Sequence, residues 1–253
     1  MTERDRVADT TTDAFLAGRL LLRQPKRGHR AGHDAILLAA ATPAKAGDRV
    51  IEFGAGVGAA GLALARRAGA IDLTLVEISD DLAALAADNA KANGIAANVL
   101  TFDVESGASL WTQAGLGPDS TDVVLMNPPF NDPSRHRASS DPNKQLAHMA
   151  TGTTLEMWIH AARRVLKPGG VLTLIWRADG LNDVLAALGR GFSGLAILAV
   201  HSDMNSAAIR VVVRASKGGK APLEIHPALV LNDAAGQPTE RARTILSGGA
   251  LPL

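Results

Sequence analysis

The sequence predicts an α/β fold: a doubly wound, mostly parallel sheet of seven strands, with helices on both faces and short extensions at both ends. Three observations favour this class. Short apolar runs alternate with helical patterns from about residue 48 to residue 214, as in sheets built from βαβ units. A glycine-rich turn joins the first of these runs to the first helix. The sequence shows neither an internal repeat nor a second core. We therefore expect one domain, 45–215, with an N-terminal extension, 13–44, and a C-terminal extension, 216–253.

Composition narrows the class of protein. The 253 residues, 47% hydrophobic and 20% charged, can bury a substantial core. The net charge of +1 does not mark a general nucleic-acid binder, so such a partner would have to use local patches. The absence of cysteine excludes disulfides, thiolate metal ligands and cysteine nucleophiles. The polar, charged opening and the short apolar run at 35–41 predict a cytoplasmic protein without a membrane-spanning segment. Oligomeric state is not readable from the sequence.

The segment after residue 12 is basic. Five cations occur with no acid among them: Arg19, Arg23, Lys26, Arg27 and Arg30. Apolar residues between 15 and 22 predict a short strand or an amphipathic segment, and Asp34 is placed to cap a helix over 35–41. Two interpretations of the cations remain open. They form either a solvated surface or an edge that contacts phosphates beside a ligand site.

The strand at 49–53, the turn Gly54-Ala55-Gly56-Val57-Gly58 and a helix at 59–68 form a nucleotide-binding βα unit. The glycines let the backbone turn sharply and approach a ligand closely. The next strand, 71–76, ends in Glu77, whose carboxylate can accept hydrogen bonds from both hydroxyls of a ribose. Together, these features predict an adenosine-containing cofactor.

Glu52 distinguishes between cofactors. It lies two residues before the first glycine, where a carboxylate could hold the ammonium of an amino-acid moiety. A dinucleotide has no need of an acid there and places its pyrophosphate at the helix start. The pattern therefore points to S-adenosylmethionine, with NAD and a dehydrogenase as the remaining alternative.

A helix and a third strand follow Glu77. Ser79 is placed to cap a helix at 80–91, and the strand at 98–102 ends in Asp103. Asp103 has two open roles: it could accept a hydrogen bond from the exocyclic amine of adenine, or it could cap a turn.

The strand at 122–126 ends abruptly in Asn127-Pro128-Pro129-Phe130. Neither proline has an N–H for the sheet, and each restricts the residue before it, so a stiff loop is expected. In an open parallel sheet, this edge is where ligands bind. A rigid turn that buries Phe130 is the structural alternative, but the three strand-end acids favour a functional loop.

The remaining elements follow from periodicity and from breaker residues. An irregular helix is expected at 111–119, and the polar stretch 131–154 predicts a mobile lid beside the active edge. Beyond it, the pattern predicts a helix at 154–166, a strand at 171–176, a helix at 181–188, antiparallel strands at 195–200 and 209–213, a basic turn at 217–220, a hairpin-like piece at 223–236 and a helix at 239–246.

Five motifs, in this order and spacing, resemble S-adenosylmethionine-dependent methyltransferases of the Rossmann-like class: IEFGAGVG, LVE, FD, NPPF and LKPGG. NPPF is similar to the (Asp/Asn/Ser)-Pro-Pro-(Tyr/Phe/Trp) loop of enzymes that methylate exocyclic or amide nitrogens. With GHRAGHDAILLAAA and LVLNDAAGQPTERARTIL, the chain resembles the bacterial tRNA(Val) adenine-N6 methyltransferase family over nearly all its length beyond residue 12. Three positions depart from that family: Glu52 replaces the usual Asp, Phe130 the common Tyr, and His33 a small residue or Thr.

The resemblance and the motifs together define the expected site. The catalytic loop is Asn127, Pro128, Pro129 and Phe130. The cofactor-binding residues are Glu52, Gly54, Ala55, Gly56, Gly58, Glu77, Ile78, Asp103, Val104, Asn127, His33 and Asp34. The RNA-contacting residues are Arg23, Lys26, Arg27, Arg30, Arg135 and Arg137. The expected cofactor is S-adenosyl-L-methionine, the expected partner is RNA, with tRNA as its class, and no metal is expected because the sulfonium supplies the driving force.

An amino group conjugated to a ring has a delocalised lone pair. Hydrogen bonds from that group to the Asn127 side-chain oxygen and the Pro128 carbonyl would favour a tetrahedral nitrogen and stabilise its developing charge. Phe130 would stack on the base. Two alternatives stay open: a methyltransferase acting on a protein glutamine or a small molecule, and a non-catalytic module that binds S-adenosylmethionine or RNA.

Overall fold

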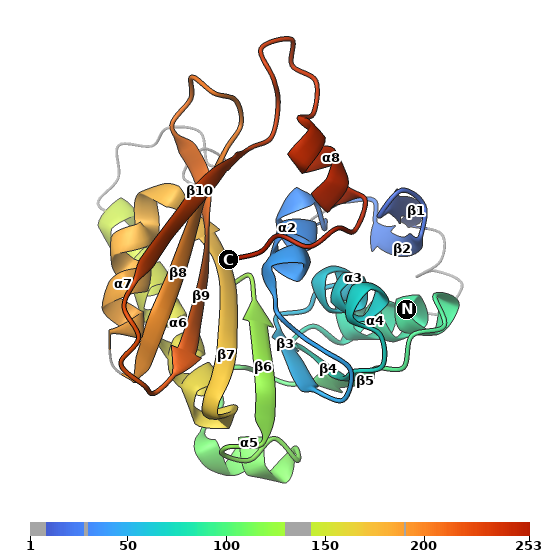
Figure 1. Ribbon diagram of the computed structural model, residues 1–253. Coiled ribbons are helices and arrows are strands. Elements are labelled where there is room, and N and C mark those ends of the chain that lie inside the picture. Colours follow the sequence, from blue (N-terminus) through green and yellow to red (C-terminus); the bar gives the residue numbers. More distant parts are fainter. Residues whose placement is uncertain (1–8, 28–29, 130–142, 190) are drawn as a thin grey trace.

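The computed structural model describes residues 9–27, 30–129, 143–189 and 191–253, with side-chain detail from residue 154 onward in the third range. A mostly parallel sheet runs through the molecule in the strand order β10-β8-β9-β7-β6-β3-β4-β5 (Figure 1). The α/β class is confirmed, although the sheet has eight strands rather than seven. The strands are β3 Arg49–Phe53, β4 Asp72–Glu77, β5 Asn98–Thr101, β6 Thr121–Met126, β7 Leu166–Arg177, β8 Phe192–His201, β9 Ala208–Lys217 and β10 Glu224–Val230.

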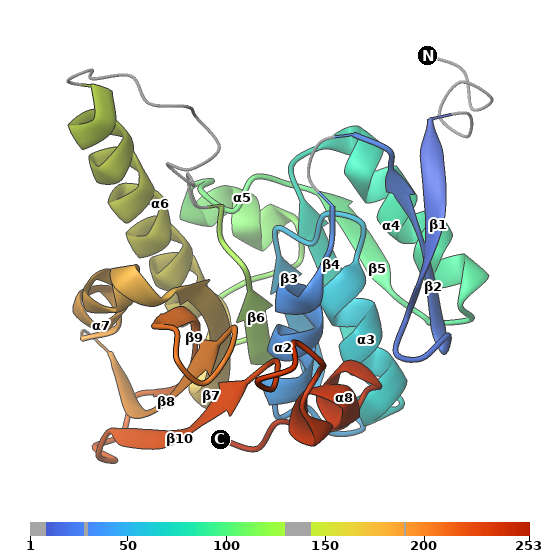
Figure 2. The ribbon, with the colours of Figure 1, turned by 90° about the horizontal axis from the view of Figure 1, so that it is seen from above.

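Helices cover both faces of this sheet (Figure 2). They are α2 His33–Ala41, α3 Ala59–Ala68, α4 Asp80–Ala92, α5 Ala108–Gln113, α6 Asn143–Val165, α7 Leu181–Leu188 and α8 Glu240–Leu246, with a 3-10 turn, η2, at Ala178–Gly180. One hydrophobic cluster joins the sheet to α2, α3, α4 and α8, and the other joins it to α5, α6 and α7. The alternation along β3 assigns the faces, because Val50 lies in the first cluster and Ile51 in the second.

The extra strand comes from the C-terminal extension. We expected a hairpin-like piece at 223–236, but β10 pairs in parallel with β8 and forms one edge of the sheet. The turn that follows is organised by Asp233, which accepts hydrogen bonds from the backbone of Ala235 and Gln237. The hairpin expectation is therefore confirmed only at the turn, where Asn232 and Pro238 form an antiparallel bridge. The strand itself pairs with β8, because a turn signal after a strand does not reveal which strand is its partner.

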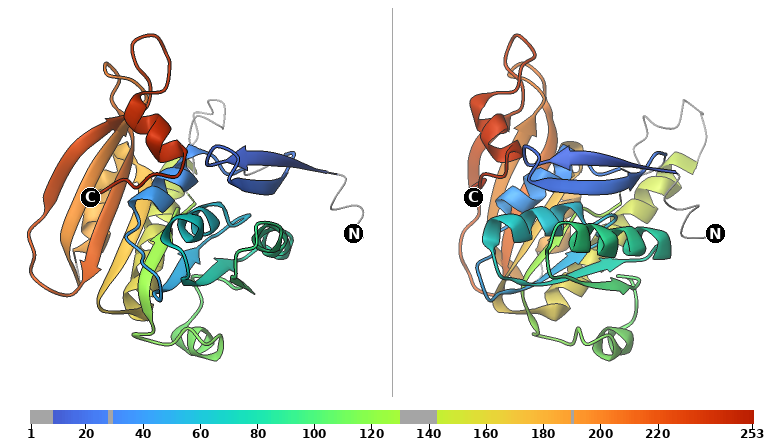
Figure 3. Two further views of the ribbon diagram at one scale, coloured as in Figure 1. Left: turned by 45° about the vertical axis from the view of Figure 1, so that its right-hand side comes forward. Right: turned by 90° about the vertical axis from the view of Figure 1, so that its right-hand side faces the viewer.

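The N-terminal extension contains an antiparallel hairpin, β1 Thr10–Phe15 and β2 Leu20–Pro25, which projects beside α4 (Figure 3). This confirms the strand that the apolar residues predicted, and Leu20 and Leu22 are fully buried. The expected cap of α2 was wrong. The helix begins at His33 after Gly32, without a side-chain cap, and Asp34 lies in its first turn.

Two further expectations changed along the chain. Helix α6 begins at Asn143, so the second half of the stretch predicted as a lid is helical, and residues 130–142 lie outside the described part of the chain. The irregular helix expected at 111–119 is α5, which ends at Gln113. The Ser79 cap of α4 is confirmed, since its hydroxyl accepts a hydrogen bond from the N–H of Leu82.

Candidate active site

A cleft of about 1040 Å³ opens at the carboxyl ends of β3, β4 and β6. The glycine turn, the strand-end acids and the start of the Asn-Pro-Pro loop line it, together with the N-terminal residues that lead into α2. Eleven of the twelve predicted cofactor residues lie on its wall: His33, Asp34, Glu52, Gly54, Ala55, Gly56, Glu77, Ile78, Asp103, Val104 and Asn127. The exception is Gly58, the N-cap of α3, which packs against Leu62 and Leu75.

The glycine turn approaches an aromatic ring very closely. Gly54 has φ +63°, and a Cβ added there would lie 2.5 Å from Cη2 of Trp158. Trp158 belongs to α6, lines the cleft and packs edge-on against Phe53. Only glycine fits this position, because both the backbone angle and the ring exclude a side chain.

Glu52 is a buried carboxyl beside the backbone N–H groups of Ala60 and Gly61 at the start of α3. Its side chain faces α3, and Oε2 accepts a hydrogen bond from the N–H of Gly61 at 2.7 Å. Burial raises the pKa of Glu52 from 4.5 to about 8; the Gly61 hydrogen bond lowers it, and the charge of Glu77 raises it further. A cation bound beside this carboxyl would therefore favour its ionised form.

Both carboxyl oxygens of Glu77 accept hydrogen bonds from the backbone. Its Oε2 accepts from the N–H of Gly56 at 2.8 Å, and its Oε1 accepts from the N–H of Ser79 at 2.9 Å. Asp103 is exposed and accepts from the N–H of Glu105 at 2.9 Å, so it caps its own turn while it also lines the cleft. An ionised carboxylate has about four acceptor positions, and both acids keep capacity for a ligand.

The Asn-Pro-Pro loop provides a polar atom of a different kind. Oδ1 of Asn127 is buried and has no hydrogen-bond partner among the residues that the structure describes. Asn127, Pro128 and Pro129 all line the cleft, and Pro128 is buried. Phe130, the fourth residue of the predicted catalytic loop, lies outside the described residues. A buried acceptor without a donor is costly, so this atom is suited to receive an N–H or O–H from a ligand.

The far wall of the cleft includes a residue that the sequence did not indicate. Arg210 of β9 donates from Nε to Oδ2 of Asp34 at 2.8 Å, and both residues line the cleft. Arg210 lies far along the chain from every motif, so only the pairing of β9 with β7 brings it here. The sequence also did not indicate Trp158, because an aromatic residue inside an amphipathic helix is most often a core residue.

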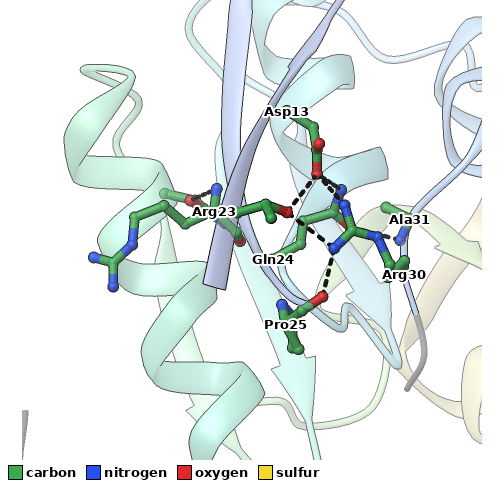
Figure 4. Close-up of polar contacts among 8 residues, drawn as sticks. Asp13, Arg23, Gln24, Pro25, Arg30 and Ala31 are labelled. Carbon is green, nitrogen blue, oxygen red and sulfur yellow. Dashed lines mark hydrogen bonds and ion pairs between the residues drawn. The ribbon is translucent and has the colours of Figure 1, made fainter. Parts of the chain in front are cut away.

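The predicted RNA-contacting residues differ in how far their side chains are already bound to the protein. Arg30 is committed to the protein: it donates to the carboxylate of Asp13 at 2.5 Å, to the hydroxyl of Thr11 at 3.0 Å and to the carbonyl of Pro25 (Figure 4). Arg23 forms a looser ion pair with Asp88, at 3.4 Å. Lys26 and Arg27 are exposed. Arg135 and Arg137 lie outside the described residues.

The fold and the cleft define the class of this protein. A glycine turn after β3, an acid at the end of β4 and an Asn-Pro-Pro loop after β6 surround one cleft of a doubly wound sheet, as in Rossmann-like methyltransferases that use S-adenosylmethionine. Residues 32–203 match the family model of the methyltransferase small domain, and the chain therefore belongs to that family. It is a methyltransferase whose cofactor is S-adenosyl-L-methionine.

Individual relatives extend this comparison. The tRNA1(Val) (adenine(37)-N6)-methyltransferase of Dickeya chrysanthemi is 25% identical over 225 residues, which cover 88% of this chain and 87% of the relative. The release factor glutamine methyltransferase of Chlorobaculum tepidum is 25% identical over 162 residues, covering 62% of this chain and 54% of the relative. A crystal structure of a predicted O-methyltransferase from Agrobacterium tumefaciens is 30% identical, with a TM-score of 0.73, and covers 87% of this chain and 99% of that one.

Two features are absent from the described residues, a membrane-spanning helix and a cluster of metal ligands. None of the helices there is both long and apolar enough to cross a bilayer. No group of three or more His, Cys, Asp or Glu side chains in the same residues could hold a metal ion.

Proposed function

We propose that this methyltransferase acts on the exocyclic amino group of an adenine in RNA, and that the RNA is a tRNA. The observation that supports methylation of a nitrogen is the buried Oδ1 of Asn127, at the end of β6 beside Pro128, which has no hydrogen-bond partner among the described residues. The resemblance to tRNA1(Val) (adenine(37)-N6)-methyltransferases supports the substrate class.

The acceptors at this loop match an NH₂ group. One N–H of the target would donate to Oδ1 of Asn127 and the other to the carbonyl of Pro128. Because both acceptors stabilise positive charge on the nitrogen, they lower the barrier to its attack, an effect worth several kcal/mol in an enclosed site. The stiff Pro-Pro backbone holds the acceptors in place before the substrate arrives.

We assign the cofactor's parts to the lining residues. Glu52 would hold the methionine ammonium, Glu77 the ribose hydroxyls, and Asp103 the adenine amine. When bound, S-adenosylmethionine supplies an electrophilic methyl group on a sulfonium cation. The protein's own contribution is the placement of these carboxylates and the exclusion of water by Trp158 and Pro128, both nearly buried.

Local charge supports an RNA partner. Lys26 and Arg27 are exposed on the segment that leads from β2 to the cleft wall, and Arg23 forms a 3.4 Å surface ion pair with Asp88. Exposed cations such as these can exchange surface contacts for a phosphate at little cost. An adenine inside a folded RNA would have to be unstacked to reach the cleft, which costs a few kcal/mol.

The substrate can be identified directly. Purified protein is incubated with labelled S-adenosylmethionine and a cell extract that is split into tRNA, other RNA, protein and small-molecule fractions. We expect label in the tRNA, with N6-methyladenosine as the labelled nucleoside by mass analysis. Label confined to another fraction would contradict the proposal.

A glutamine side chain is the second candidate, because its amide also presents an NH₂ group to the two acceptors. The similarity to a release factor glutamine methyltransferase favours it, although that similarity covers only 54% of the relative. Label in protein, located at glutamine by peptide mass analysis, would establish this candidate. A protein that binds S-adenosylmethionine and labels no fraction would indicate a non-catalytic module.

A further inference from the structure

The hairpin β1–β2 is attached to α4 by two asparagines. Asn93 accepts a hydrogen bond from the N–H of Leu21 at 3.0 Å and donates to its carbonyl at 2.7 Å. Asn89 makes the same pair of contacts with Arg23, at 2.8 and 3.0 Å. Leu21 and Arg23 are two residues apart on β2, so their backbone N–H and C=O groups point to the same edge of the strand. The two amides fill the hydrogen bonds of that edge as a neighbouring strand would.

Asn89 makes one contact that Asn93 does not make. Its side chain is 1% exposed, and Nδ2 also donates to the carbonyl of Val57 at 3.0 Å. Val57 stands between Gly56 and Gly58 in the turn that lines the cleft. The N–H of Gly58, in the same peptide unit as that carbonyl, donates to the carbonyl of Ala55 at 2.8 Å. Because a peptide unit is planar, these two contacts fix its orientation at both ends.

The hairpin extends this attachment to the N-terminal wall of the cleft, the part lined by residues 30–35. Gln24 of β2 is 1% exposed; its Oε1 accepts from the N–H of Ala31 at 2.7 Å, and its Nε2 donates to Asp13 at 2.8 Å (Figure 4). Asp13 also holds the guanidinium of Arg30. Arg30 and Ala31 both line the cleft. The glycine turn and the N-terminal wall are therefore connected through Asn89, β2 and Gln24.

We propose that Asn89 is a positioning residue of the cofactor site. It holds the peptide unit of Val57 and Gly58 in the orientation that the cleft requires, and it sets the distance between the glycine turn and the N-terminal wall. Without its amide, the buried Val57 carbonyl loses its donor, and the turn gains alternatives that bind the cofactor poorly. The effect is expected on cofactor binding rather than on the chemical step.

Asn93→Ala is the matched control, because it removes an equal pair of hairpin contacts, together with a hydrogen bond from Nδ2 to the carbonyl of Asn89, without touching the turn. S-adenosylmethionine binding is measured by calorimetry on the full chain without RNA, at a temperature where circular dichroism shows all variants folded. We expect Asn89→Ala to weaken binding about tenfold and Asn93→Ala by less than about twofold. Hydrogen exchange of the amides at 54–58 in the free protein should quicken only in Asn89→Ala.

A purely structural role would give a different result. If both variants weaken binding equally, or if Asn89→Ala leaves it unchanged, the proposal is wrong. Should Asn89→Ala not fold, Asn89→Asp keeps the acceptor for Arg23 and removes the donor to Val57; unchanged affinity in that variant also overturns the proposal. With a methyl acceptor in hand, Asn89→Ala should raise KM for S-adenosylmethionine while kcat stays within about threefold. The binding test does not depend on the identity of that acceptor.

Discussion

The two halves of the cleft differ in whether their polar side chains have hydrogen-bond partners within the described part of the protein. On the side of β3 and β4, the carboxyl groups of Glu52 and Glu77 accept hydrogen bonds from backbone N–H groups before any ligand binds. At the end of β6, the buried oxygen of Asn127 has no partner among the described residues. The first half is organised by the protein's own backbone, whereas in the second the described residues leave an acceptor open to a donor. This difference is what a transferase requires, because stabilisation that appears only during reaction accelerates the reaction.

The largest effect is expected from removing the Asn127 side chain, which changes the second half of the cleft alone. Asn127→Ala should lower kcat by about 100- to 1000-fold, the range seen when one preorganised group is removed from a reacting centre. The affinity for S-adenosylmethionine, measured by calorimetry, should change less than about threefold. Asn127→Asp retains an acceptor and is expected to keep more activity than the alanine variant. Full turnover by Asn127→Ala would remove the role that we give this side chain.

The next effect concerns the first half and its pH dependence. The pKa of Glu52 is raised to about 8, so below that pH the free protein holds the carboxyl protonated. A bound ammonium selects the ionised form, and affinity for S-adenosylmethionine should therefore rise up to tenfold per pH unit toward pH 8 and then level off. Glu52→Gln should bind weakly, with no such pH dependence. An identical pH profile in both proteins would show that another group is responsible.

The Glu52 carboxyl should also make stability depend on pH, but the free energy of unfolding falls with rising pH whereas the cofactor affinity rises. Because the folded state keeps a proton that the unfolded chain loses above its ordinary pKa of 4.5, the free energy of unfolding should fall between pH 4.5 and 8. The limiting slope is about 1.4 kcal/mol per pH unit. Denaturant melts of Glu52→Gln without cofactor should lack this decline. The residue would then bind the cofactor at the expense of stability.

An effect of intermediate size is expected from adding a methyl group at Gly61, which tests how closely the β3 and β4 side of the cleft is packed. Alanine normally favours a helix over glycine by about 1 kcal/mol. At Gly61, however, a Cβ would lie 2.6 Å from both Oε2 of Glu52 and Cδ2 of Leu75. We expect Gly61→Ala to destabilise the protein by about 1–3 kcal/mol and to weaken cofactor binding. Gly107→Ala, where nothing lies within 4 Å, is the control and should change the melting temperature little.

The smallest expected effects separate two arginines near the cleft. Arg27 is exposed, and Arg27→Ala should weaken tRNA binding a few-fold and reduce its salt dependence by about one counterion, with stability unchanged. Arg30 is bound to Asp13, Thr11 and Pro25, so Arg30→Ala should lower the melting temperature. Filter binding over a range of salt and thermal melts check both variants. A stability loss in Arg27→Ala with unaltered RNA binding would reverse these assignments.

Most of the predicted site depended on local signals, and the residues that carry those signals line one cleft. A glycine turn, an acid at a strand end and an Asn-Pro-Pro sequence each specify a backbone geometry within a few residues. Parallel strands then bring such ends to one edge without further information. Nine of the twelve predicted cofactor residues line the cleft for this reason, whereas His33 and Asp34 reach it from α2. Gly58 does not, because its positive φ and its packing on Leu62 and Leu75 serve the turn rather than the ligand surface.

The sequence by itself determined the α/β class, the cofactor and which residues follow the strands at the cleft edge, because periodicity and turn residues act over short distances. Only the tertiary structure decided the partners of β10, Arg210, Trp158 and Asn89, since each meets residues far away in the chain. It also separated Arg27 from Arg30 within one basic run. Sequence supplies charge, but the acid that neutralises it comes from another strand, and that pairing is fixed only when the whole chain has packed.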